Sequence, residues 1–61
     1  MKKTVSDYIK KYKIDVNTLR IYDESLEDEI YDVYEIKEYA KAVVVNAYKH
    51  NGAPVLQVKH K

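Results

Sequence analysis

Carboxylates crowd the middle of this chain, and they are the side chains whose density could support specific chemistry. They are Asp23, Glu24, Glu27, Asp28, Glu29 and Asp32. A calcium loop that began at the first of them would need glycine at its sixth position and glutamate at its twelfth, where this chain has Asp28 and Tyr34. The spacing therefore excludes an EF-hand loop and favours electrostatic attraction of a positively charged partner.

Tyrosine is the second informative residue type, because the chain has seven tyrosines and no phenylalanine or tryptophan. A tyrosine offers a large ring with a polar tip, which suits interfaces where a few anchors dominate affinity. Tyr31 and Tyr34 adjoin the carboxylates, and since odd and even strand positions face opposite ways, at least one ring should be exposed. We predict a protein-binding surface made of Asp23, Glu24, Glu27, Asp28, Glu29, Tyr31, Asp32 and Tyr34.

Residues that would support catalysis are scarce. The chain has no thiol, its serines are Ser6 and Ser25, and its histidines, His50 and His60, have no orienting acid nearby in the sequence. Two histidines without a cysteine also argue against a structural zinc site. We expect a protein that is not an enzyme, with no catalytic residue, no metal site and no cofactor.

The net charge of +1 conceals three segments of alternating sign. Residues 1–22 carry a net charge of +4, residues 23–38 carry −7, and residues 39–61 carry +4. A field of this shape steers a charged partner toward one face of a protein. The sequence has no apolar run of the length that a secretory signal or a membrane span requires. We therefore expect one cytoplasmic domain over residues 1–61 that does not contact a membrane.

The N-terminal third shows a resemblance that points to another function. Residues 4–24 resemble, without a gap, the first helix-turn-helix of the MerR-like transcription regulators. The residues that carry this resemblance are Thr18, Leu19, Arg20, Tyr22, Asp23 and Glu24. It implies DNA binding through a recognition helix that presents Asn17, Thr18 and Arg20, and Lys49 would add a phosphate contact. DNA binding is the alternative function.

The first element that must position these residues is a helix over residues 5–13. An apolar stripe at the helical spacing i, i + 3, i + 4 and i + 7 is formed by Val5, Tyr8, Ile9 and Tyr12. Thr4 is the expected N-cap, with Asp7 returning a hydrogen bond. The spacing predicts that the rings of Tyr8 and Tyr12 pack in the core.

A β-hairpin is expected at the C-terminal end, with strands at 42–48 and 54–60. Asn51 and Gly52 tolerate positive φ and favour a two-residue turn that pairs His50 with Ala53. The register then places on the core face Val43, Val45, Ala47, Leu56 and Val58. It places on the other face Val44, Asn46, Tyr48, Val55, Gln57 and Lys59.

The middle of the chain permits two interpretations. Residues 19–22 and 30–34 are rich in β-branched and aromatic side chains, which favours two strands around an acidic turn and a short helical turn near 36–41. The alternative is one continuous helix over residues 26–41, which would place like charges four positions apart. We predict an α+β domain of order αββαββ, with the N-terminal helix packed on a mostly antiparallel sheet, over a three-helix fold with a hairpin.

The favoured function is a small regulatory or inhibitory module that binds a protein partner. Dense carboxylates imitate nucleic-acid phosphates, so the partner class that they suit is a nucleic-acid-handling protein. The small size and simple composition suit the accessory genes of phages and other mobile elements. A homodimer in which the hairpin edge pairs with its own copy is a third role left open.

Overall fold

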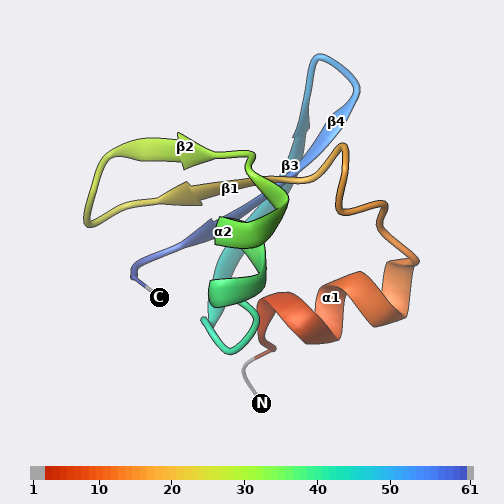
Figure 1. Ribbon diagram of the computed structural model, residues 1–61, viewed down its shortest axis with the longest axis horizontal. Coiled ribbons are helices and arrows are strands. Elements are labelled where there is room, and N and C mark those ends of the chain that lie inside the picture. Colours follow the sequence, from red (N-terminus) through yellow and green to blue (C-terminus); the bar gives the residue numbers. More distant parts are fainter. Residues whose placement is uncertain (1–2, 61) are drawn as a thin grey trace.

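The elements follow the predicted order in the computed structural model, which describes residues 3–60. They are α1 (Val5–Tyr12), β1 (Arg20–Asp23), β2 (Asp28–Ile30), α2 (Val33–Glu38), β3 (Val44–His50) and β4 (Ala53–Val58). The strands form one sheet of order β2-β1-β4-β3, in which β1 and β4 are parallel and the other two pairs are antiparallel (Figure 1). The α+β class and the mostly antiparallel sheet are confirmed.

Helix α1 begins as the sequence predicts and ends at a left-handed residue. The Asp7 backbone N–H donates to Thr4 Oγ1 at 3.3 Å, and the Thr4 N–H donates to Asp7 Oδ2 at 3.0 Å. The hydrogen bond from the Thr4 backbone, and then interaction with the Thr4 side chain, lower the pKa of the Asp7 carboxyl. Lys13 ends the helix with a φ of 52°, and its N–H donates to the carbonyl of Ile9. The side chain of Tyr12 is 59% exposed, so its predicted place in the core is wrong.

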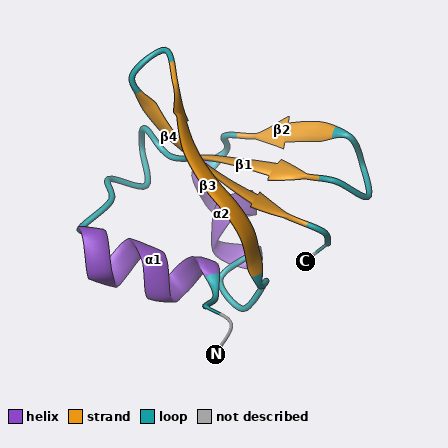
Figure 2. Cartoon of the chain, turned by 180° about the vertical axis from the view of Figure 1, so that it is seen from behind, coloured by secondary structure: helices purple, strands orange, loops and turns teal. Residues whose placement is uncertain are grey.

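The hydrophobic core lies between one face of the sheet and the two helices. Its buried residues are Val5, Leu19, Ile21, Ile30, Ile36, Tyr39, Ala42, Leu56 and Val58. Figure 1 shows α2 in front of the sheet, and from behind, strands β3 and β4 pass in front of α2 (Figure 2). No helix of residues 3–60 covers the opposite face, and none is long and apolar enough to cross a membrane.

The hairpin turn lies where the sequence predicts it. Asn51 and Gly52 have φ values of 52° and 81°, and His50 pairs with Ala53. The strands themselves run closer to the turn than expected, at 44–50 and 53–58. The tolerance of positive φ at these two positions was therefore a sufficient signal for the turn.

A β-bulge changes the register in the first half of β3. The pairing shifts between Val44 and Asn46, so that Val44 lies opposite Val58 and packs against the core. Val45 is the extra residue and its side chain is 47% exposed, while Val43 is 37% exposed. The prediction that Val43 and Val45 face the core is wrong, because one inserted residue reverses the alternation of every residue before it.

Between the bulge and the Asn51-Gly52 turn, the register is as predicted, but the burial of Ala47 and Val55 is not. Ala47 lies opposite Leu56, which is buried, yet Ala47 itself is exposed because the hairpin extends beyond α1 and α2. Val55 lies on the uncovered face but is only 1% exposed. Its cross-strand partners are Arg20 on β1 and Tyr48 on β3, and long side chains of this kind can cover an apolar neighbour.

The middle of the chain forms two short strands and a short helix. Strand β2 ends at Ile30, and Asp32 caps α2 by accepting the Tyr34 N–H at Oδ1 over 2.8 Å. The helix therefore begins at Val33 instead of near residue 36, and the predicted strand 30–34 stops early. The alternative of one continuous helix over 26–41 is wrong.

The predicted helix-turn-helix is also wrong, because residues 13–23 contain no helix. Asn17 and Thr18 belong to a turn in which the Asn17 N–H donates to Asp15 Oδ1 at 2.9 Å and the Thr18 hydroxyl donates to the Asp15 carbonyl at 3.0 Å. Arg20 begins β1, where Ile21 is fully buried between β2 and β4. Pairing within the sheet has overridden the local resemblance.

The outer edge of β3 is partly occupied by its own chain. The Val44 N–H donates to the carbonyl of Lys3 at 2.8 Å, and Thr4 forms a β-bridge with Val43. The Ala47 N–H donates to Asn46 Oδ1 at 3.0 Å. These contacts satisfy backbone groups that a second copy would need for edge pairing.

Candidate functional site

Asp23 lies inside the protein, at the end of β1. Its side chain is 2% exposed and accepts three hydrogen bonds. The Tyr39 hydroxyl donates to Oδ2 at 2.6 Å, and the N–H and hydroxyl of Ser25 donate to Oδ1 at 2.9 and 2.7 Å. The prediction of Asp23 as a contact residue is therefore wrong. Asp23 instead links Tyr39, the residue after α2, to Ser25 in the β1–β2 turn.

The buried pair of Asp23 and Tyr39 is stabilised with the carboxyl ionised and the phenol neutral. Burial would raise the pKa of Asp23, but the hydrogen bonds from Tyr39 and Ser25 outweigh burial and lower it. Burial, together with the hydrogen bond to Asp23, raises the pKa of Tyr39 to about 12. The carboxylate is thus charged and the phenol neutral throughout the physiological range.

The raised pKa of Tyr39 predicts a loss of stability in alkali. The folded-state pKa of about 12 exceeds the unfolded value of about 10, so this stabilisation is complete below pH 10 and declines as the pH rises toward 12. At pH 11 the decline should be about 1.4 kcal/mol, measured by urea denaturation at several pH values. The Tyr39→Phe variant lacks this titration and should show a shallower decline. Parallel curves for the two proteins would contradict the assignment.

The turn between β1 and β2 carries two exposed carboxylates and one that is half-buried. Glu24 is half-buried and accepts a hydrogen bond from Gln57 Nε2. Glu27 is exposed at the turn with a φ of 52°, and Asp28 is exposed while its Oδ1 accepts the Glu29 N–H at 2.9 Å. The turn therefore presents Glu27 and Asp28 to solvent as predicted.

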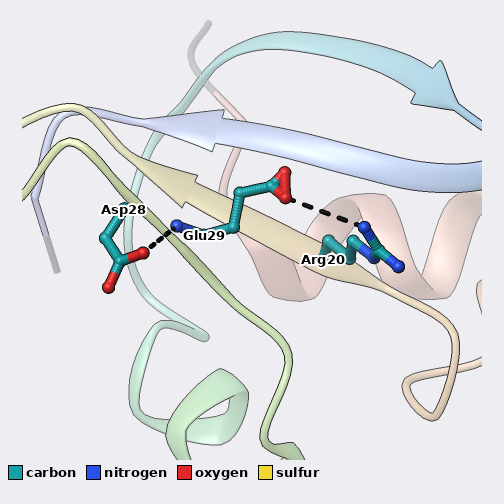
Figure 3. Close-up of polar contacts among 3 residues, drawn as sticks. All are labelled: Arg20, Asp28 and Glu29. Carbon is teal, nitrogen blue, oxygen red and sulfur yellow. Dashed lines mark hydrogen bonds and ion pairs between the residues drawn. The ribbon is translucent and has the colours of Figure 1, made fainter.

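Arg20 connects the carboxylates to a tyrosine ring. Its Nη1 lies 3.7 Å from Glu29 Oε1 on the neighbouring strand, and its guanidinium carbon lies 5.5 Å from the ring centroid of Tyr31. Figure 3 shows Glu29 reaching along β1 toward Arg20, with Asp28 beside the start of β2. The sequence assigned Arg20 to the DNA-binding alternative, but in the structure it contacts Glu29 and Tyr31 of the predicted protein-binding set. The ring of Tyr31 is 64% exposed.

Tyr34 projects from the first turn of α2. Its side chain is 79% exposed, and Lys37 Nζ lies 5.8 Å from its ring centroid. Asp32 is exposed and serves as the N-cap of this helix. Tyr31 and Tyr34 are thus both exposed. The strand alternation that we used to predict their exposure does not apply, because β2 ends at Ile30 and Tyr34 belongs to α2.

Two further tyrosines, which the predicted binding surface did not include, lie on the uncovered face of the sheet. Tyr22 lies between Glu29 and Gln57, and Tyr48 lies opposite Val55 with 42% of its side chain exposed. Tyr22 stands two positions after Arg20, so strand alternation in β1 was the signal that could have found it. The hairpin register had already placed Tyr48 on the face away from the core, and the structure confirms this. Lys49, from the DNA-binding set, is exposed on β3 opposite Pro54.

The described residues 3–60 contain no group of three or more histidine, cysteine, aspartate or glutamate side chains that could hold a metal ion. The predicted contact residues that are exposed or half-buried, here called the acidic surface, are Glu24, Glu27, Asp28, Glu29, Tyr31, Asp32 and Tyr34, with Arg20 among them. Comparisons of the chain with protein-family models, with curated proteins and with solved structures find no match.

Proposed function

We propose that this chain is a small non-catalytic module, regulatory or inhibitory in role, that binds a protein partner through the acidic surface. The observation that supports this most directly is the exposure of Tyr31 and Tyr34, whose side chains are 64% and 79% accessible. Exposed tyrosines beside charged groups are typical anchors of protein interfaces.

The rings of Tyr31 and Tyr34 are already held in place in the free protein, which also supports a role in an interface. Arg20 stacks on Tyr31 and is itself held by the ion pair with Glu29, while Lys37 lies over Tyr34. Each exposed contact is weak, but together they restrict the rotamers that a free ring would sample. A ring that is already ordered loses less side-chain entropy when a partner covers it.

The carboxylates define the chemistry of the partner. Glu27 and Asp28 are exposed on the β1–β2 turn, and the adjoining strand carries Glu29. A partner with a basic groove would be attracted by these charges and would then cover the tyrosine rings. We propose a nucleic-acid-handling protein, because its phosphate-binding groove has the required charge and is accessible.

Alanine substitutions at the exposed tyrosines test this proposal. The tagged chain is used to retain partners from its host cell, with and without duplex DNA as competitor. Tyr31→Ala or Tyr34→Ala should weaken retention by about 2 kcal/mol, or about thirtyfold in affinity, if the ring is an anchor. Folding stability should change little because both rings are exposed.

Tyr12→Ala is the matched control, since Tyr12 is 59% exposed but lies on α1, outside the acidic surface. It should retain the partner as well as the wild type does. Glu27→Lys should slow association, most clearly at low salt. If both tyrosine variants retain the partner fully, or Tyr12→Ala loses it equally, the acidic surface is not the contact.

A further inference from the structure

An open groove separates α1 from the β3–β4 hairpin. Its volume is about 660 Å³, and its apolar walls include Tyr8 and Tyr12 on one side and Ala47, Pro54 and Leu56 on the other. The two tyrosine rings lie 5.7 Å apart and form a continuous aromatic wall. The groove is open because the tip of the hairpin extends away from α1, so that no helix lies against it (Figure 1).

Positive charge surrounds this groove. Lys49 belongs to its lining, and Lys11 Nζ lies 5.5 Å from the ring centroid of Tyr12. None of the described residues that line the groove is acidic. The groove therefore suits an apolar side chain flanked by carboxylates.

The β1–β2 turn of the same protein is a segment of this kind. Leu26 is 63% exposed in the β1–β2 turn, directly before Glu27 and Asp28, which are also exposed. This turn lies at the left of Figure 1, whereas α1 and the tip of the hairpin lie at the right. One molecule therefore cannot insert its own turn into its own groove, but a second copy can.

We propose that the protein associates head to tail, with the Leu26 turn of one copy bound in the groove of another. The apolar side chain of Leu26 would lie between the rings of α1 and the hairpin, and its flanking carboxylates would face Lys11 and Lys49. A groove of this volume holds a ligand about the size of the tip of a turn. The contact is heterologous, so a pair of copies keeps one unused turn and one unused groove, and further copies can add to give chains or rings.

The association should be weak and dependent on concentration. The whole chain exposes 4501 Å², and a turn in a groove buries far less than the roughly 800 Å² per partner of a standard interface. Self-association would also cover Glu27 and Asp28, and so compete with the proposed partner. It does not rest on the proposed function, because it uses Leu26 and the groove instead of Tyr31 and Tyr34.

Sedimentation of the full chain from micromolar to millimolar concentration tests this proposal. The mean mass of the wild type should rise with concentration, and high salt should reduce the rise. Leu26→Ser, which alters the turn, and Tyr12→Glu, which alters the groove, should each weaken association at least tenfold. Both side chains are mostly exposed, so circular dichroism should show that the variants fold. If Tyr12→Glu does not fold, Lys49→Glu takes its place.

A mixture of the two variants gives the most specific outcome. Leu26→Ser keeps an intact groove and Tyr12→Glu keeps an intact turn, so an equimolar mixture should form dimers and nothing larger. Tyr34→Ala is the control and should associate as the wild type does. A wild type that stays monomeric throughout overturns the proposal, as does a Leu26→Ser variant that associates normally through another surface. Retention of the protein partner is measured at nanomolar chain concentration, where self-association is negligible, so the two proposals fail separately.

Discussion

Replacing Asp23 with alanine should lower the free energy of unfolding by about 3 kcal/mol or more. The wild-type carboxylate accepts bonds from the Tyr39 hydroxyl and from two donors of Ser25, all within 2.9 Å. Hydrogen bonds to a charged group each contribute about 1.5 to 3 kcal/mol, partly offset here by removal of a buried charge. A domain of this length has a total stability of only about 3 to 9 kcal/mol. Urea denaturation at neutral pH measures the loss.

A double-mutant cycle identifies the origin of this loss. Tyr39→Phe removes only the hydroxyl and should cost about 2 kcal/mol, and the double variant should be less destabilised than the two single losses combined. Tyr31→Phe removes a hydroxyl from an exposed ring and should leave stability unchanged. Additive losses at Asp23 and Tyr39 would show that their 2.6 Å contact does not stabilise the fold.

Local patterns predicted those parts of the fold that short-range chemistry determines. The Thr4 capping box, the Asn51-Gly52 turn and the Ile21-Tyr22 pair of β1 each act within a few positions, and each lies where the sequence placed it. The element order followed from these signals. Strand order did not, because the parallel pairing of β1 with β4 joins segments more than thirty residues apart.

The candidate site was less predictable because its residues come together across the sheet. Asp23 stands among exposed carboxylates in the sequence, but its burial depends on Tyr39, sixteen positions later. Arg20 joins Glu29 and Tyr31 only because β1 and β2 pair in the register that places Ile21 opposite Ile30. The exposure of Glu27 and Asp28 was predictable, since a polar turn carries its side chains into solvent.

The bulge in β3 provides the most direct test of where sequence reasoning failed. Counting outward from the turn without a bulge makes Val45 and Val58 cross-strand partners that both face the core. The structure instead places Val44 opposite Val58, leaving Val45 47% exposed and Val58 fully buried. Nothing in the run of valines at 43–45 marks which residue is the extra one, because all three have the same side chain.

Alanine substitution of these two valines should therefore give unequal results. Val58→Ala removes two buried carbon atoms and leaves a cavity in the core, so the free energy of unfolding should fall by about 2 to 3 kcal/mol. Val45→Ala removes the same atoms from an exposed edge position and should cost less than about 1 kcal/mol, mostly through lower β propensity. Urea denaturation of both variants under one condition measures the difference directly. Equal losses would mean that both side chains are buried, which holds only if β3 has no bulge and pairs with β4 in the regular register.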